Sequence, residues 1–149
     1  MISRLVYFST ILAILIANLS ILIQANTECV WATGRVVCNK NQSLVVGSVV
    51  EVWDLDSPQN IDIKNPVDPD DKVGFSLVED KLGVFNVEGC ASDVDWLPGI
   101  HKNSPEFYIR VHHYCNKPSG EFKTILPIFR TYVPQTYDYH INNPIELDD

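Results

Sequence analysis

Between residues 26 and 149, no stretch of helix length repeats its apolar residues with the period of about 3.6 that marks an amphipathic helix. Short runs rich in β-branched and aromatic residues alternate instead with glycine, proline, asparagine and aspartate. We expect strands near residues 30–38, 44–54, 73–79, 84–88, 107–116, 122–133 and 137–141. About seven short strands separated by turns are typical of an antiparallel β-sandwich, so the chain is predicted to be all-β.

The connections between these runs carry turn and loop signals. Asp54–Asp71 is rich in aspartate and contains three prolines, which excludes a central strand and predicts an acidic loop. Cys90–Pro105 is predicted to be a second loop, and the last residues, Glu146–Asp149, are expected to be frayed. Asp80–Gly83 is expected to form a turn between two strands, with Gly83 free to adopt a positive φ.

The first 25 residues differ from the rest of the chain. Arg4 is followed by an almost wholly apolar run, Leu5–Ile23, and then by the small residue Ala25. This order is typical of a cleaved secretory signal peptide, although the run also approaches the length that spans a bilayer. We therefore predict a signal peptide at 1–25, a mature domain at 26–149 and secretion without stable membrane insertion. A retained N-terminal anchor is the alternative.

The charge of the chain limits its partners. The net charge is −8 at pH 7, and it becomes −9 when residues 1–25 and their single arginine are removed. Such an acidic surface repels the phosphate backbone of nucleic acids and the headgroups of anionic membranes. We therefore expect neither nucleic acid binding nor membrane binding through a basic patch.

Four cysteines lie in the predicted mature domain: Cys29, Cys38, Cys90 and Cys115. An even number in a small secreted domain predicts two disulfides, and spacing alone does not choose among the three possible pairings. There is no CxxC pair, so we expect no zinc site and no bound cofactor. Asn41-Gln42-Ser43 is a sequon for N-glycosylation at Asn41.

Phe107–Asn116 (FYIRVHHYCN) holds two adjacent histidines and a cysteine, which raises the question of a metal or catalytic site. Successive side chains of a strand point to opposite faces, so His112 and His113 cannot share one metal ion. His113 shares its face with Cys115, but a bridged sulfur cannot act as a nucleophile. We therefore expect no catalytic site here, and we expect His113 to pack beside a disulfide and to hydrogen-bond with the backbone.

The opposite face of this strand carries the candidate binding residues. Four polar or aromatic side chains lie there, and we predict that they form a binding surface: Tyr108, Arg110, His112 and Tyr114. Trp53 is a further candidate, because strand alternation turns it away from Val50 and Val52.

The order of several motifs resembles the nematode transthyretin-like family of secreted proteins. The matching segments are Ala32–Cys38 (ATGRVVC), Val50–Asp56 (VEVWDLD), Asp68–Asp71 (DPDD), Gly74–Phe85 (GFSLVEDKLGVF) and Val111–Asn116 (VHHYCN), with a partial match at Tyr132-Val133. The resemblance covers about residues 30–133, and His113 falls on the histidine of the family motif. A second family cysteine soon after Asn116 is missing, whereas Cys29 and Cys90 are additions.

The resemblance implies a transthyretin-like sandwich of the immunoglobulin-like kind, secreted and without catalytic activity. The resemblance and its departures together lead us to expect the disulfides Cys38–Cys115 and Cys29–Cys90. The resemblance also implies an extracellular binding protein that carries a small hydrophobic or lipid ligand or bridges cell-surface components. The partner would then be an extracellular protein, a lipid or a small hydrophobic molecule.

Two other functions have weaker support. Calcium takes six to eight oxygen ligands and could bind the acidic loop, but the spacing of its aspartates is not that of an EF-hand: Asp54, Asp56, Asp62, Asp68, Asp70 and Asp71. Transthyretin-related hydroxyisourate hydrolases carry a C-terminal Y-R-G-S motif, which Pro144–Asp149 lacks. We therefore expect no enzyme activity.

Overall fold

The computed structural model describes residues 7–15, 25–56, 69–94, 104–130 and 136–148. Residues 7–15 are helical, and no helix among the described residues is both long and apolar enough to cross a membrane. Residues 16–24, which precede the predicted cleavage point, lie outside the described residues, so cleavage stays a prediction. The same is true of the middle of the acidic loop, residues 57–68, and of residues 95–103.

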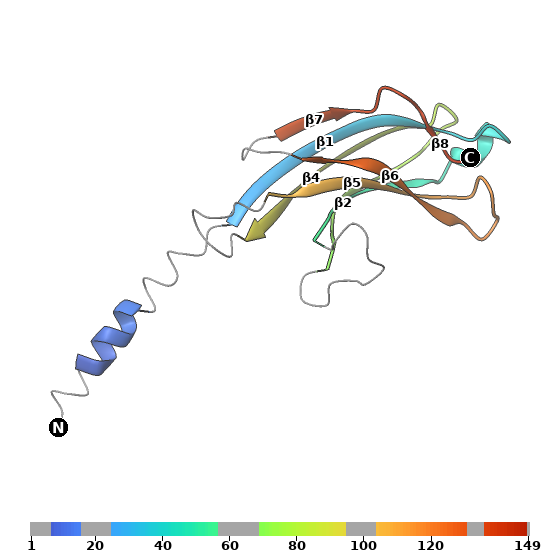
Figure 1. Cartoon of the computed structure of the whole chain (residues 1–149). Helices are drawn as coiled ribbons and strands as arrows, with labels where there is room; N and C mark the ends of the chain where they lie inside the picture. The colour runs from blue at the N-terminus through green and yellow to red at the C-terminus, as the bar shows by residue number, and fades with distance from the viewer. Residues whose placement is uncertain (1–6, 16–24, 57–68, 95–103, 131–135, 149) are drawn as a thin grey trace.

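The described strands form two sheets that lie face to face (Figure 1). In the first sheet, β4 (Val84–Val94), β1 (Ala25–Val37) and β7 (Thr136–His140) lie side by side, and β8 (Ile145–Glu146) also pairs with β1. In the second sheet the order is β3 (Asp71–Leu77), β2 (Val49–Asp54), β5 (Glu106–His113) and β6 (Glu121–Arg130). A short 3-10 helix, η1 (Gln42–Val45), lies between β1 and β2 along the chain.

Alternation along the strands places one set of apolar side chains between the sheets. Val50 and Val52 of β2 are fully buried, and Glu51 between them is only partly covered. Phe107, Ile109 and Val111 of β5 lie inside in the same way. β1 and β4 supply the facing layer: Val30, Ala32, Val36, Phe85 and Val87. Burying such a side chain stabilises the fold by roughly 1.5–3 kcal/mol, so this layer holds the sheets together.

Two glycines bring the sheets into contact along one side of the sandwich. A Cβ on Gly74 of β3 would lie 2.4 Å from the carbonyl oxygen of Glu88, and a Cβ on Gly89 of β4 would lie 2.3 Å from that of Val73. Only glycine permits so close an approach, so β3 and β4 meet although they belong to different sheets. A separate groove of about 570 Å³ is lined by β6 and by the segment that includes the end of β7: Lys123, Ile125 and residues 139–146.

The β-sandwich predicted from the sequence is confirmed, but it is not purely antiparallel. β7 and β8, with which the chain returns to the first sheet after β6, run parallel to β1. The runs at 73–79 and 84–88 form strands joined by a turn with Gly83 at φ 72°, as expected. These strands pair with different partners, however, β3 with β2 and β4 with β1. The turn therefore joins the two sheets.

Some boundaries predicted from the sequence are wrong. Cys90–Val94 belongs to β4 rather than to a loop, since β1 continues beside it as far as Ala25. Leu44-Val45 lies in η1 rather than in β2. The C-terminal segment is not frayed, because Ile145 pairs in β8 and Leu147 is buried.

Candidate functional site

β5 divides its side chains between the core and an outer face. Ile109 and Val111 are buried between the sheets, whereas Arg110 and His112 are only partly covered. His113 is 1% exposed and shares the inner face with the two apolar residues. The two adjacent histidines therefore point to opposite faces, as the alternation predicts.

Neighbouring strands extend the outer face across the second sheet. Glu51 of β2 lies opposite both Arg110 and Phe75, and His112 lies opposite Phe122 of β6. Directly opposed residues of an antiparallel pair point to the same side. We name this surface the aromatic face, and it comprises Glu51, Trp53, Lys72, Phe75, Leu77, Arg110, His112, Tyr114 and Phe122.

Arg110 lies between two aromatic rings of this face. Its Cζ atom is 3.8 Å from the ring centroid of Phe122 and 5.6 Å from the ring of Trp53. The ring of His112 is 4.8 Å from that of Phe122 and 5.1 Å from that of Tyr114, between centroids. A cation over an aromatic ring stabilises by about 0.5–1 kcal/mol at an exposed site. Four of the five residues predicted as a binding surface are therefore held in one layer.

The carboxylate opposite Arg110 is engaged elsewhere. Glu51 accepts a hydrogen bond from Trp53 Nε1 at 2.9 Å and forms an ion pair with Lys72 at 3.2 Å. Within the described part of the chain, the ion pairs involve Lys72, His113 and Lys117 and not Arg110. The aromatic face thus keeps one guanidinium that forms no ion pair with a described carboxylate.

Tyr108, the fifth predicted residue, is covered. It points to the same side as Trp53, but it is only 9% exposed, and its hydroxyl donates to Asp70 Oδ2 at 3.0 Å. Burial and then the charge of Asp70 raise the pKa of Tyr108. Tyr108 therefore anchors the residues before β3 and is not part of the exposed surface.

Apolar side chains of the aromatic face remain in contact with water. Phe75 is 65% exposed, Leu77 is 51% exposed and Phe122 is 53% exposed. Sequence reasoning missed these residues because alternation shows which side chains share a face of one strand, but not which strand lies next to it. The period-two spacing of Phe75 and Leu77 was the one sequence signal that these two side chains share a face.

All four cysteines are bridged, in the two pairs expected from the resemblance. Cys29 and Cys90 lie directly opposite each other in β1 and β4, with 4.0 Å between their Cα atoms. Cys38 and Cys115 follow β1 and β5, so this second disulfide joins the two sheets.

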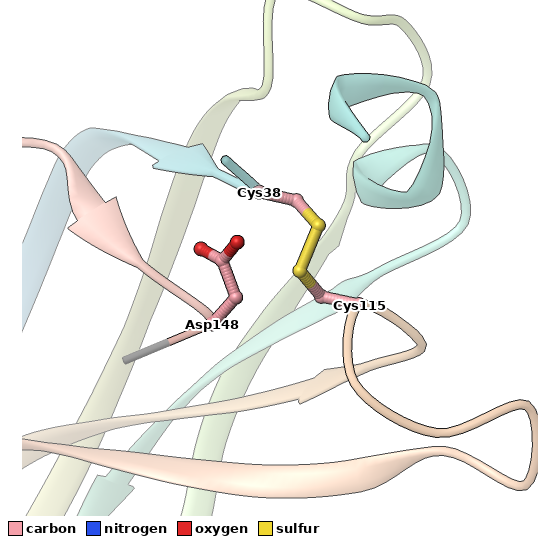
Figure 2. A group of neighbouring side chains, drawn as sticks. All are labelled: Cys38, Cys115 and Asp148. Carbon is pink, nitrogen blue, oxygen red and sulfur yellow. A yellow bond between two sulfur atoms is a disulfide. The ribbon is translucent and has the colours of Figure 1, made fainter. Parts of the chain in front are cut away.

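Asp148 lies beside the Cys38–Cys115 disulfide, as Figure 2 shows. Its carboxylate accepts hydrogen bonds from the backbone N–H groups of Asn39 at 3.0 Å and Lys40 at 2.7 Å. These hydrogen bonds, that of Asn39 first, lower the pKa of Asp148. Bridged sulfurs supply no thiolate, so this group fixes the C-terminal segment and is not a metal site.

His113 lies near the same disulfide. The N–H of Cys115 donates to His113 Nδ1 at 3.4 Å, and His113 Nε2 is 3.8 Å from a carboxylate oxygen of Glu121. Burial lowers the pKa of His113, and the charge of Glu121 only partly opposes it. The expected packing of His113 beside a disulfide, with a hydrogen bond to the backbone, is confirmed.

Three carboxyl groups converge where β2 and β4 end. Asp54 and Asp93 are buried and Asp56 is partly buried, and their oxygens lie within 4.8 Å of one another. Asp54 Oδ1 also accepts a hydrogen bond from the N–H of Glu106 at 2.8 Å. Burial, followed by the charges of Asp93 and Asp56, raises the pKa of Asp54 to about 8. The arrangement favours a proton shared by Asp54 and Asp93.

The calcium site considered from the sequence is only partly within the described residues. Two of its aspartates lie in 57–68, outside those residues. Asp70 accepts hydrogen bonds from the Tyr108 hydroxyl and from the N–H of Asp56, so it acts as a structural acceptor. Calcium binding by the loop stays a prediction.

No protein-family model matches this chain, and no curated protein matches it either.

Proposed function

We propose that this chain is a secreted extracellular binding protein without enzymatic activity, and that the aromatic face is its contact surface. The observation that carries the proposal is the grouping of Trp53, Arg110 and Phe122 beside exposed apolar side chains on one sheet. Trp, Tyr and Arg dominate the binding energy of protein interfaces, and large exposed apolar patches on soluble proteins usually mark contact sites. The partner is an extracellular protein, a lipid or another apolar molecule.

Several features support the extracellular setting. Two disulfides are typical of proteins that fold in an oxidising compartment. Asn41, in its sequon, is exposed at the start of η1. The apolar segment before the sandwich has the composition of a signal peptide.

Membership of the transthyretin-like family is part of the proposal. It is supported by the order of the motifs between about residues 30 and 133 and by the two-sheet sandwich. The disulfide at Cys115, next to the motif histidine His113, is compatible with that family pattern.

The bonding of His113 and Cys115, the best candidates for a catalytic pair, supports the absence of enzymatic activity. The sulfur of Cys115 is bridged, and Nδ1 of His113 accepts a backbone hydrogen bond. Neither group is free to attack a substrate.

A pair of charge-introducing variants tests the contact surface. Phe122→Glu places a carboxylate on the aromatic face, whereas Leu82→Glu places one at a residue that is 64% exposed in the turn before β4. We expect native mass spectrometry of the protein from its own secretory cells to show a bound component for wild type and for Leu82→Glu. Phe122→Glu should lose that component. Retention by Phe122→Glu, or no bound component in any of the three proteins, would contradict the proposal.

A further inference from the structure

Arg110 supplies the aromatic face with a cation and with N–H donors. Arginine carries five N–H donors and no acceptor, and it remains charged at any physiological pH. The Cζ atom of Arg110 lies over the ring of Phe122 at 3.8 Å and is 5.6 Å from the ring centroid of Trp53, and neither contact is a hydrogen bond. The N–H donors of a guanidinium lie in its plane, so a contact of the group with an aromatic ring face leaves them available.

Neighbouring charges leave that cation unbalanced. Glu51 lies opposite Arg110 in the sheet register, but its carboxylate holds Lys72 and the indole N–H of Trp53. Lys72 and Glu51 balance each other, so the described charges of the aromatic face sum to the one positive charge of Arg110. This positive site belongs to a chain whose net charge is −8.

Apolar surface adjoins the cation. Phe122 on β6 contacts the guanidinium and is 53% exposed. Phe75 and Leu77 on β3, which are 65% and 51% exposed, lie two strands from Arg110 on the other side of Glu51, and Lys72 Nζ is 5.5 Å from the Phe75 ring centroid. Two strand spacings are about 10 Å, within reach of an extended alkyl chain. A ligand that satisfies both features has one anionic group for Arg110 and an apolar part for the exposed side chains. A carboxylate matches the guanidinium best, because its two oxygens accept two parallel N–H bonds.

We propose that the aromatic face binds a single-chain amphiphile with a carboxylate head, such as a fatty acid, and that Arg110 holds the carboxylate. This inference rests on the proposed function and adds the chemical class of the ligand. It also assigns the residue that distinguishes an anionic from a neutral ligand.

A free amphiphile fits the charges better than the surface of an anionic membrane does. Membrane recognition through charge takes a cluster of roughly four to eight basic residues. The aromatic face has Arg110 and Lys72, and Lys72 is already paired with Glu51. The negative net charge of the chain also opposes its approach to an anionic bilayer.

Decanoate and decanol have carbon chains of equal length and differ in the head group. Comparing them separates the contribution of the head group to binding from that of the alkyl chain. Calorimetric titration of the disulfide-bonded protein should show tighter binding of decanoate than of decanol. Arg110→Gln should weaken decanoate binding at least about tenfold, because it removes the charge and the paired N–H bonds, and should weaken decanol binding much less. Arg110→Lys should restore part of the loss, because the charge returns without the planar fork.

Arg35→Gln is the matched control, since Arg35 is exposed on β1 of the other sheet and the change in charge is the same. It should leave both titrations unchanged. Equal affinity for the two probes, or equal losses in Arg110→Gln and Arg35→Gln, would overturn the inference. Binding to phosphatidylglycerol vesicles that depends on Arg110, without binding of decanoate, would overturn it in favour of a membrane partner.

These results are distinguishable from failure of the proposed function. If decanoate does not bind but the component seen by native mass spectrometry still depends on Phe122, the carboxylate ligand is excluded and the contact surface stands. If neither is found, both proposals fail.

Discussion

Two glycines with left-handed backbone angles differ in the space around the position that a Cβ would take. Gly47 has φ 83°, and nothing lies within 4 Å of the position that a Cβ would take. Gly83 has φ 72°, and a Cβ there would lie 2.2 Å from the carbonyl oxygen of Val36. The N–H of Val36 donates to the carbonyl of Gly83 at 2.8 Å, so the turn cannot move away from β1 without losing that bond.

We therefore expect unequal effects of the same substitution at these two positions. Gly47→Ala should reduce the free energy of unfolding by roughly 1–2 kcal/mol, the effect of a left-handed alanine alone. Gly83→Ala should reduce it clearly further, because the methyl group also collides with the backbone of β1. Urea denaturation of both variants measures the difference, and equal midpoints would show that the contact has no effect.

Asn41 combines a structural role with a predicted modification. Its Oδ1 accepts a hydrogen bond from the N–H of Ser43 at 3.0 Å and caps η1, and the residue is exposed. A glycan attached through the side-chain nitrogen would leave that oxygen in place.

We predict that the protein recovered from the medium of secretory cells carries a glycan at this position. Enzymatic removal of N-glycans should lower the mass of wild type and should not change the mass of Ser43→Ala. That variant destroys the sequon and keeps the Asn41 cap, so it separates glycosylation from folding. An unchanged mass for secreted wild type would refute the prediction.

At the scale of elements, the C-terminal segment closes the sandwich. β8 pairs with β1 at Val36 and Val37, and the N–H of Leu147 donates to the carbonyl of Val37 at 2.9 Å. Leu147 is 1% exposed, and Asp148 beyond it holds two backbone N–H groups. Ile145 and Leu147 therefore belong to the hydrophobic core.

Leu147→Ala should lower the free energy of unfolding by about 2–5 kcal/mol, the range for leucine truncation in a packed core. Glu146→Ala alters an exposed neighbour and should change it by less than about 0.5 kcal/mol. Thermal unfolding of both variants provides the comparison. A small effect at Leu147 would mean that the segment is not part of the core.

The sequence predicted the directions of side chains better than the partners of strands. Alternation correctly placed His112 and His113 on opposite faces and turned Trp53 away from Val52, since these are properties of a single strand. It did not reveal that β3 and β4 enter different sheets, because their turn resembles that of a hairpin. Parallel pairing of β7 also went unpredicted, because it depends on residues distant in the sequence.

The same limit applies to the candidate site. Arg110 and His112 could be placed together, whereas Phe122 could not, because its position against Arg110 requires the register of β5 with β6. The burial of Tyr108 depends on Asp70, which lies 38 positions earlier in the chain. Neither contact has a local signal in the sequence.

At the scale of the whole molecule, the carboxyl pair links the two sheets. Asp54 belongs to β2 and Asp93 to β4, and the charges nearest to Asp54 are those of Asp93 and Asp56. The pKa of Asp54 is about 8 in the folded protein, against an ordinary value of 3.8. Folding thus favours the protonated form, and unfolding between pH 3.8 and about 8 releases a proton.

Stability should therefore fall as the pH rises toward about 8 and level off above it. The slope should be at most about 1.4 kcal/mol per pH unit. Below its ordinary pKa of 6.5, His113 acts in the opposite sense, because burial lowers its folded pKa and unfolding takes up a proton. The clearest window thus lies between pH 6.5 and about 8.

Chemical denaturation across that window measures the slope for wild type and for Asp54→Asn. The variant keeps an oxygen for the N–H of Glu106 but cannot ionise, so its slope should be close to zero. An equal slope in both proteins would assign the titration to another group. Calcium that stabilises wild type and not the variant would instead make the carboxyl groups a cation site.

The pairing of β1 with β7 and β8 has a consequence for how the protein is made. The first strand of the sandwich pairs in parallel with the last two, and the contact between Asn39 and Asp148 joins residues 109 positions apart. Such non-local pairing slows folding to roughly milliseconds to seconds. During synthesis, one edge of β1 stays unpaired until β7 and β8 have been translated. We expect nascent chains to be most prone to aggregation in that interval, when they depend on chaperones.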